Sequence, residues 1–307
     1  MKRLWHQVTD SSAFRLAVKS KAGRRLTGTG AWRSMDMQRN RILMARSVAA
    51  DPHLFDEVKT FCLFVGHNKS GTSLLGSLLD AHPRVVMSDE VGALRYIEAG
   101  FDRRMLFHRL MKGARSEARK GRVTARRLEP YSYAVPGQWQ GRVDRPLVVG
   151  DGMAGTTTRM LGRQPDLLDR TREVLGPVEL KLIQVIRNPY DPISVMMVRG
   201  GRTFRNAIDH YFSACRTLTE IRAALPPETL HEVRYEEFIR DPILGLGRLC
   251  RFAGVGADRL YTADCVAILR TEPDRSRSMV EWGEPWVAEV RSRMQEFDFL
   301  EGYVYEQ

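Results

Sequence analysis

A short apolar segment followed by a loop between two glycines constrains the fold of this chain more than any other feature. The run TFCLFV at 60–65 is typical of a buried β-strand, and TSLLGSLLDA at 72–81 has apolar residues at helical spacing. Gly66 and Gly71 bound the loop between them. The N-terminus of a helix attracts anions, because its first N–H groups are unpaired and its dipole is positive there. The sequence therefore predicts an anion site at 66–73.

The rest of the chain alternates between strand and helix patterns. Further strands are expected at 85–87, 146–149, 179–186 and 230–234. Helices are expected at 91–99, 101–120, 167–175, from about Asp191, at 203–225 and over most of 235–253. Such alternation predicts an α/β fold with a central parallel sheet flanked by helices.

Positive charge is concentrated in two segments of the chain, which has a formal net charge of +11. Residues 1–58 hold 11 Lys and Arg against 5 Asp and Glu, and they are predicted to form a basic arm or helical appendage. Residues 59–307 are predicted to form the main domain, with a basic helix-loop insertion at about 101–146. Residues 101–145 hold 12 basic against 4 acidic residues. Three explanations stay open: attraction of an anionic donor or acceptor, association with nucleic acid or a membrane surface, and solvated surface.

Several classes of protein are disfavoured by the sequence. No apolar stretch approaches the roughly 18–20 residues of a membrane span, and the N-terminus lacks the apolar core of a secretory signal. Nucleic-acid-binding signatures are not found, so no nucleic-acid partner is expected. The cysteines form no CxxC pair, which argues against a metal cluster or a disulfide framework and suits the cytoplasm. They are Cys62, Cys215, Cys250 and Cys265.

The loop at 66–73 differs from a Walker A loop, GxxxxGK[ST], in the position of its lysine. Thr72 occupies the place of the Walker lysine, and Lys69 lies inside the loop instead. Backbone N–H groups of residues 70–73 can hold an anion, with Lys69 approaching from the loop side. This chemistry suits a nucleotide phosphate without requiring a Walker-type Mg²⁺ site. The alternative is a plain glycine turn with a surface lysine.

The segment Lys69-Ser-Gly-Thr-Ser-Leu-Leu resembles the 5′-phosphosulfate loop of sulfotransferases that use 3′-phosphoadenosine 5′-phosphosulfate (PAPS), especially the bacterial enzymes. His82-Pro83, the segment 184–194, and Arg234–Glu237 with Asp241-Pro242 are similar to later elements of that family. The resemblance covers about residues 59–254. It implies a P-loop-NTPase-like sulfotransferase fold, PAPS as sulfuryl donor and the nucleotide PAP as product, with no metal. It also implies that the donor is held by His67, Asn68, Lys69, Ser70, Gly71, Thr72 and Ser73.

A second anion site is expected for the 3′-phosphate of the donor. Arg187 follows an apolar strand, and a guanidinium can bind phosphate in a bidentate manner. By the resemblance, Ser194 would add a hydroxyl, although many family members place that serine eight residues after the arginine rather than seven. Arg275 and Arg277 would belong to a C-terminal loop that closes over the nucleotide, or to a solvated charge run.

Sulfuryl transfer requires stabilisation of the leaving phosphate and a base for the acceptor proton. Lys69 suits the first role, because its cation can lie beside the bridging oxygen. Glu90 is predicted as the base, by resemblance to sulfotransferases that use a carboxylate at about this place after the phosphate loop. The other candidates for the base are Asp89, His67, Asp151 and His108.

The acceptor is the least constrained part of the prediction. The loop from Tyr131 to Gly141 offers aromatic faces for a sugar or another planar apolar group, and the adjacent basic segment would tolerate an anionic acceptor. A small molecule or glycan is expected: a carbohydrate, a lipid or a natural product. Two other functions stay open, a P-loop-like nucleotide kinase and a non-catalytic nucleotide- or glycan-binding relative. The sequence leaves the oligomeric state open.

Overall fold

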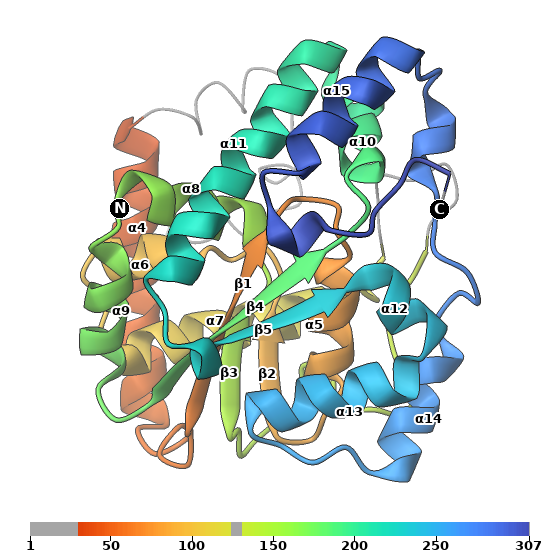
Figure 1. Ribbon diagram of the computed structural model, residues 1–307. Coiled ribbons are helices and arrows are strands. Elements are labelled where there is room, and N and C mark those ends of the chain that lie inside the picture. The colour runs from red at the N-terminus through yellow and green to blue at the C-terminus, as the bar shows by residue number, and fades with distance from the viewer. Residues whose placement is uncertain (1–29, 124–130, 307) are drawn as a thin grey trace, which may run out of the picture. The chain divides into compact units, whose positions relative to one another are not determined.

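The computed structural model describes residues 30–123 and 131–306 (Figure 1). The chain divides into two compact units, residues 1–50 and 51–307. Helix α4 (Gly30–Ala50) is the described part of the first unit, and all other elements belong to the second. The predicted basic arm at 1–58 lies partly outside the described residues, so this domain assignment stays a prediction.

A parallel sheet of five strands forms the centre of the second unit (Figure 1). The strands are β1 (Thr60–Gly66), β2 (Val85–Ser88), β3 (Val148–Asp151), β4 (Glu179–Ile186) and β5 (Leu230–Arg234). Their order in the sheet is β2-β3-β1-β4-β5, with β1 parallel to both β3 and β4. The predicted fold class is therefore confirmed.

Helices connect the strands and cover the sheet. They are α5 (Thr72–Asp80), α6 (Ala93–Glu98), α7 (Arg103–Arg119), α8 (Ala154–Arg163), α9 (Leu167–Leu175), α10 (Tyr190–Gly200), α11 (Phe204–Ala223), α12 (Tyr235–Arg240), α13 (Pro242–Ala253), α14 (Arg259–Ala267) and α15 (Glu284–Met294). Short 3₁₀ helices lie at η1 (Pro227–Thr229), η2 (Ser276–Met279) and η3 (Asp298–Leu300). No helix among the described residues is long and apolar enough to span a bilayer.

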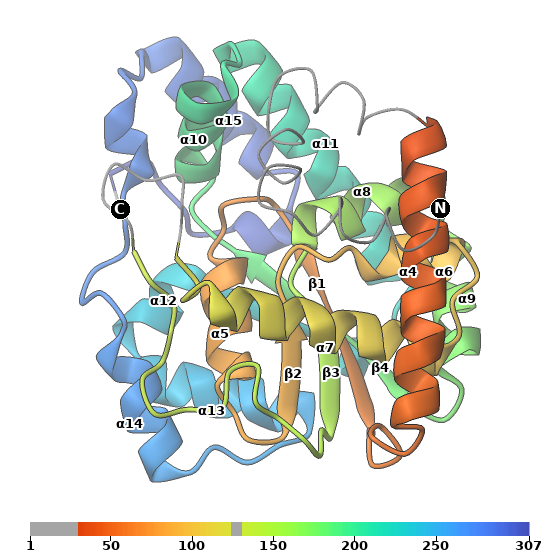
Figure 2. The ribbon, with the colours of Figure 1, turned by 180° about the vertical axis from the view of Figure 1, so that it is seen from behind.

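The two faces of the sheet are buried against different helices (Figures 1 and 2). On one face, Cys62 and Phe64 of β1 belong to a buried cluster that also contains apolar residues of α5, α13 and α14. On the other face, the Phe61 ring stacks on Phe107 of α7, with centroids 5.8 Å apart. Burial on both faces explains why β1 is apolar throughout instead of alternating.

The carboxyl edge of the sheet is where a ligand site is expected. All five strands are parallel, so the segments that follow them converge at this edge. The chain moves to one side of β1 for β2 and β3, and to the other side for β4 and β5. Ligands of open α/β sheets bind at such a change of direction, and here the loop 66–71 leaves β1 at that point.

Candidate active site

A cavity of about 480 Å³ lies at the carboxyl edge of the sheet. Residues that follow each of the five strands contribute to it, among them Lys69 after β1, Glu90 after β2, Met153 after β3, Arg187 after β4 and Tyr235 after β5. Of the residues predicted from sequence, the cavity is lined by Asn68, Lys69, Gly71, Thr72, Ser73, Glu90 and Arg187. The structure therefore brings the predicted phosphate loop, the predicted base and the predicted 3′-phosphate arginine together.

Gly71 has a backbone conformation at the start of α5 that a residue with a Cβ atom would not tolerate. It has φ of 101°, and a Cβ atom there would lie 2.5 Å from Cδ2 of Tyr235. Among the described residues, no side chain caps α5. The first turn of this helix, including Thr72 and Ser73, therefore faces the cavity with the backbone N–H groups that an anion requires.

The start of the phosphate loop is anchored by α8 and α11. The Gly66 N–H donates to Oγ1 of Thr158 at 2.8 Å. The His67 ring stacks on Tyr211, with centroids 3.8 Å apart, and its Nε2 lies 2.9 Å from the Tyr211 carbonyl. Burial lowers the pKa of His67 to about 4, so the imidazole is neutral at physiological pH. His67 thus supports the loop from behind, and it does not line the cavity.

Three residues in an unusual backbone conformation gather at the cavity. Among the described residues, Lys69, Glu90 and Arg122 are the non-glycine residues with positive φ, at 72°, 56° and 47°. All three line the cavity, although they come from three different loops. This conformation is disfavoured for residues with a Cβ, and where it persists it often marks a functional site. The backbone geometry therefore supports a functional role for the cavity.

Arg187 connects the phosphate loop with the segment before η2. Its Nη1 donates to the Lys69 carbonyl at 3.1 Å, and its Nη2 donates to the carbonyl of Asp274. The guanidinium also lies over the Tyr235 ring, 4.9 Å from the centroid. Only 6% of Arg187 is exposed, so its charge is held rigidly at the floor of the cavity.

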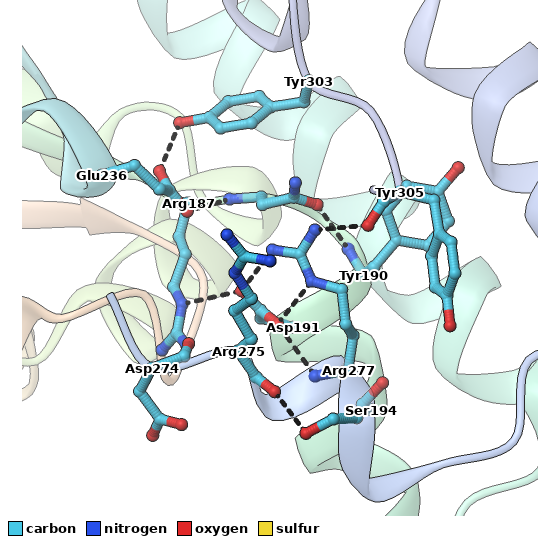
Figure 3. Close-up of polar contacts among 12 residues, drawn as sticks. Arg187, Tyr190, Asp191, Ser194, Glu236, Asp274, Arg275, Arg277, Tyr303 and Tyr305 are labelled. Carbon is cyan, nitrogen blue, oxygen red and sulfur yellow. Dashed lines mark hydrogen bonds and ion pairs between the residues drawn. The ribbon is translucent and has the colours of Figure 1, made fainter. Parts of the chain in front are cut away.

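Behind Arg187, a buried carboxylate binds two guanidinium groups (Figure 3). Asp191 accepts from Arg277 Nε at 3.0 Å, from Arg277 Nη2 at 2.9 Å and from the Arg277 backbone N–H at 2.9 Å. Arg187 Nε lies 3.4 Å from its Oδ2. The Arg277 guanidinium is therefore engaged by Asp191 and does not line the cavity, whereas Arg275 extends alongside it and is exposed.

Ser194 also differs from its predicted role. It is fully buried, and its Oγ accepts from Trp282 Nε1 at 3.0 Å. The hydroxyl fastens α10 to the segment before α15 and does not line the cavity. Ser70, which was predicted in the phosphate loop, is likewise buried at 1% exposure and does not line it.

The glutamate of the Tyr235-Glu236 motif makes hydrogen bonds to two other segments of the chain. Glu236 accepts from the Asn188 N–H at 2.9 Å and from the Tyr303 hydroxyl at 2.9 Å (Figure 3). The Asn188 side chain in turn donates to the Val304 carbonyl at 2.8 Å. The turn that follows Arg187 is therefore fixed by α12 and by the C-terminal segment.

Asp151 organises the loop that carries the candidate base. Its carboxylate accepts from Ser88 Oγ at 2.8 Å and from the backbone N–H groups of Gly92 and Ala93, each at 2.9 Å. Burial raises the pKa of Asp151, and these hydrogen bonds oppose the rise. The carboxylate is fully buried and does not line the cavity. Asp151 therefore positions the loop, and a role as base is disfavoured.

Asp89 and Glu90 both line the cavity at the end of β2. Oδ1 of Asp89 lies 3.4 Å from Oγ of Ser73, in the first turn of α5. Burial, the neighbouring charge of Glu90 and that of Asp151 raise the pKa of Asp89 to about 6. Two adjacent carboxyl groups thus face the phosphate loop, and one of them exchanges a proton near neutral pH.

We expect Asp89→Asn to stabilise the fold at neutral pH. The carboxyl has a pKa of about 6 when folded and 3.8 as its ordinary value, so the folded state binds the proton more tightly. The wild-type stability therefore falls as pH rises from about 4 to 6, and the neutral amide escapes this loss. The variant should gain roughly 1–3 kcal/mol at pH 7. Urea unfolding of both proteins at pH 4 and pH 7 measures it, and an equal gain at both values would contradict this explanation.

The loop predicted to hold the acceptor also reaches the cavity. Tyr131 and Tyr133 line it and meet edge to face, with centroids 5.2 Å apart. The Tyr131 hydroxyl donates to the Ile268 carbonyl, and Arg270 lies over the Tyr131 ring at 5.4 Å. Two aromatic side chains are thus held beside the phosphate loop by the segment after α14.

The sequence analysis did not predict the contacts by which three residues support the site. Asp191, Glu236 and Tyr303 act through contacts between distant segments, which no local pattern reveals.

His108, a candidate base, has its Nε2 3.3 Å from the Asp51 carbonyl and does not line the cavity. Within the described residues, no group of His, Cys, Asp and Glu side chains has the arrangement of a metal site.

Comparison with known proteins shows what this chain is similar to. Residues 179–259 match the model of the Sulfotransferase family. The sulfotransferase domain from the curacin biosynthetic pathway is 16% identical, with a TM-score of 0.50 over 78% of this chain and 97% of its own. A sulfotransferase from Alicyclobacillus acidocaldarius is 19% identical, with a TM-score of 0.44 over 79% of this chain and 96% of its own. A mouse sulfotransferase complexed with PAP is 12% identical, with a TM-score of 0.42 over 82% of this chain and 88% of its own. The search of curated proteins gives no match.

The fold is thus the P-loop-like α/β fold of the sulfotransferases. The matched segment includes β4 and the Tyr235-Glu236 motif, and its residues Arg187 and Tyr235 line the cavity. The resemblance to sulfotransferases that the sequence predicted is confirmed over residues 179–259 and in the fold.

Proposed function

We propose that this protein transfers a sulfuryl group from PAPS to an acceptor hydroxyl and releases PAP. The observation that carries the proposal is the pairing of two anion-binding elements in one cavity. The uncapped start of α5 with Lys69 forms one, and Arg187 forms the other. A hydrogen bond of 3.1 Å from Arg187 to the Lys69 carbonyl holds the two together. PAPS carries a phosphosulfate and a separate 3′-phosphate, which match two such elements.

The donor fits the cavity as follows. The first-turn N–H groups of α5, with Thr72 and Ser73, would hold the 5′-phosphosulfate. Arg187 would bind the 3′-phosphate, and Arg275 is exposed nearby to add a second guanidinium. Arg277 serves indirectly, because it fixes Asp191 and with it the turn after Arg187. The rings of Tyr133 and Tyr235 supply an apolar wall for the adenine ring of the donor.

The transfer step is an in-line displacement at sulfur. The acceptor oxygen forms a bond to sulfur while the bond from sulfur to the bridging phosphate oxygen breaks, and that oxygen leaves with the electron pair as part of PAP. Negative charge accumulates on the bridging oxygen, where the Lys69 ammonium would stabilise it. The acceptor proton passes to a carboxylate that faces the phosphate loop, and we assign this role to Glu90.

One feature favours this reaction over phosphoryl transfer from ATP. Thr72 stands where a Walker loop has its lysine. Two carboxyl groups, Asp89 and Glu90, lie beside the phosphate loop, where they suit a base for a neutral hydroxyl acceptor. The acceptor itself would enter from the side of these carboxyl groups, and we propose a glycan or small molecule.

Binding of PAP tests the proposal directly. A ligand that binds the folded state at 100 times its dissociation constant stabilises it by about 2.7 kcal/mol. We therefore expect PAP to raise the melting temperature by several degrees, without Mg²⁺. Arg187→Ala should remove most of the shift, whereas Arg251→Ala, at an exposed position of α13, should retain it.

Three other results would count against the proposal. A melting temperature that does not move at millimolar PAP would contradict the proposal. A shift produced by ATP with Mg²⁺ instead of PAP would favour a nucleotide kinase. PAP binding without transfer of label from ³⁵S-PAPS to sugars, lipids, phenols or peptides would favour a non-catalytic relative.

A further inference from the structure

A hydrogen bond joins the end of β2 to the first turn of α5. The Ser73 hydroxyl donates to Oδ1 of Asp89 at 3.4 Å, and both residues line the cavity. Among the described residues, this hydroxyl is the one hydrogen-bond donor to the Asp89 carboxyl. We call these two residues the Ser73–Asp89 pair. The carboxyl is therefore connected to the turn on which the anionic end of the donor would lie.

The direction of this hydrogen bond depends on the proton of Asp89. A hydroxyl group has one proton to donate, although it can accept two hydrogen bonds. While Asp89 is ionised it accepts that proton, so Ser73 cannot also donate to a ligand. When Asp89 is protonated, its carboxyl can donate to Ser73 Oγ, and the hydroxyl proton is released toward the cavity. The contact is longer than the usual O–H···O distance of about 2.5–3.0 Å, so little is lost when it reverses.

The charge of a bound donor would act on Asp89 in the same direction. An anion that accepts a hydrogen bond from Ser73 is separated from the Asp89 carboxyl by two hydrogen bonds, or roughly 4–6 Å. A like charge at such a distance disfavours the ionised form of a carboxyl. The hydrogen bond and the charge of the donor therefore both favour a neutral Asp89.

The charged groups around Asp89 are mostly acidic. They are Glu90, Arg122, Asp151 of β3 and Glu117 of α7. The Arg122 guanidinium opposes the acids, but Asp80 also binds it. Lys69 lines the same cavity, and in the proposed complex its cation lies at the donor. Burial, with a smaller effect from these acids, raises the pKa of Asp89 to about 6, so the carboxyl is close to protonation before a donor binds.

We propose that the donor nucleotide binds together with a proton, which Asp89 takes from solvent and Ser73 relays as a hydrogen bond to the donor. This inference rests on the proposed function, because it describes how PAPS and PAP enter the site. The proton bonds to a carboxylate oxygen of Asp89, and no covalent bond of the nucleotide changes. The two adjacent carboxyl groups then have different roles: neutral Asp89 helps to hold the donor, and the exposed Glu90 accepts the acceptor proton.

Calorimetry of PAP binding measures this proton directly. Titrations at pH 7 in PIPES, HEPES and imidazole, which differ in ionisation enthalpy, give the number of protons taken up for each PAP bound. Asp89→Asn cannot take up the proton, and Ser73→Ala cannot relay it. Asp169→Asn is the matched control, because the Asp169 side chain on α9 is 76% exposed and does not line the cavity.

We expect the wild type and the control to take up roughly 0.5–0.9 proton more than Asp89→Asn. From pH 6 to pH 8, the affinity of the wild type for PAP should fall about tenfold relative to that of Asp89→Asn. The phosphates of PAP also titrate at about pH 6, and the ratio of the two affinities cancels their contribution.

The Ser73→Ala variant tests the relay separately from the charge. It should bind PAP about tenfold more weakly than the wild type at pH 6, where the hydroxyl donates to the nucleotide. The difference should fall to less than about threefold at pH 8, where the carboxylate of Asp89 competes for the same hydroxyl proton.

Two results would overturn this inference alone. They are equal proton uptake by the wild type and Asp89→Asn, and an equal loss of PAP affinity in Ser73→Ala at pH 6 and pH 8. In both cases PAP still binds, so the proposed function is unaffected. Undetectable binding of PAP by the wild type at either pH would overturn the proposed function and this inference together.

Discussion

Replacement of Lys69 by alanine is expected to reduce sulfuryl transfer by about 10²–10³-fold while the fold stays intact. Removal of one preorganised group that stabilises developing charge typically costs this much in rate. Lys69 lies in the loop between β1 and α5, lines the cavity and is exposed, so little packing is lost with its side chain. Alanine meets the same backbone restriction at φ of 72° as lysine does, so the loop should keep its conformation.

The measurement is the single-turnover rate with ³⁵S-PAPS, together with the PAP shift in melting temperature. Lys59→Ala is the matched control, because Lys59 is exposed just before the opposite end of the same strand. It should keep the full rate. Glu90→Gln should also lose turnover but keep the full PAP shift, because a base acts on the acceptor and not on the nucleotide.

Retention of more than half the rate in Lys69→Ala would show that the leaving oxygen is stabilised by other groups, with Arg187 and the N–H groups of α5 as the remaining candidates. A full rate in Glu90→Gln would move the base to Asp89, whose carboxyl lies next to Ser73. The two variants therefore separate stabilisation of the leaving group from proton removal.

Strand β1 was predictable from the sequence because burial on both faces leaves an uninterrupted apolar run. The predicted bounds of β4 and β5 agree with the structure, and β1 differs by one residue. Helix α9 was also predicted with its observed bounds. In these segments the local pattern and the tertiary structure favour the same conformation.

Helix α8 was missed because its stability comes from other parts of the chain. Its sequence, AGTTTRMLGR, contains two glycines and three threonines, which have low helix propensity. Contacts across the fold compensate: Thr158 bonds Gly66 at the end of β1, and Gly162 allows a close approach to Thr217, whose Cγ2 would lie 2.7 Å from an added Cβ. A local pattern carries no information about such partners.

The same limit applies to the candidate site. Motifs predicted Lys69 and Arg187, because a loop or a strand end fixes where such residues lie. They did not predict that Ser194 and Arg277 turn away from the cavity, since the partners that hold them are 88 and 86 residues away. Sequence patterns therefore predict which loops and strand ends surround a ligand. They do not predict which side chains are instead hydrogen-bonded to other parts of the fold.

Asp191→Ala is expected to be the most destabilising single change near the site. Asp191 is 1% exposed and is the carboxylate that balances the buried guanidinium groups of Arg277 and Arg187. Removing one partner of a buried ion pair costs about 3–5 kcal/mol, because the remaining charge is left uncompensated. For a domain of this size, the melting temperature should fall by roughly 10 °C. Thermal unfolding followed by circular dichroism measures the change.

Asp209→Ala is the matched control, since Asp209 also pairs with an arginine, Arg293, at 2.7 Å. That pair differs in exposure: the Asp209 side chain is 53% exposed, against 2% for Asp191. Exposed pairs contribute at most about 1 kcal/mol, so this variant should melt within a few degrees of the wild type. Equal losses in the two variants would mean that Asp191 does not hold the cluster together. A loss confined to Asp191→Ala, accompanied by a weaker PAP shift, would show that the carboxylate positions Arg187 for the 3′-phosphate as well as stabilising the fold.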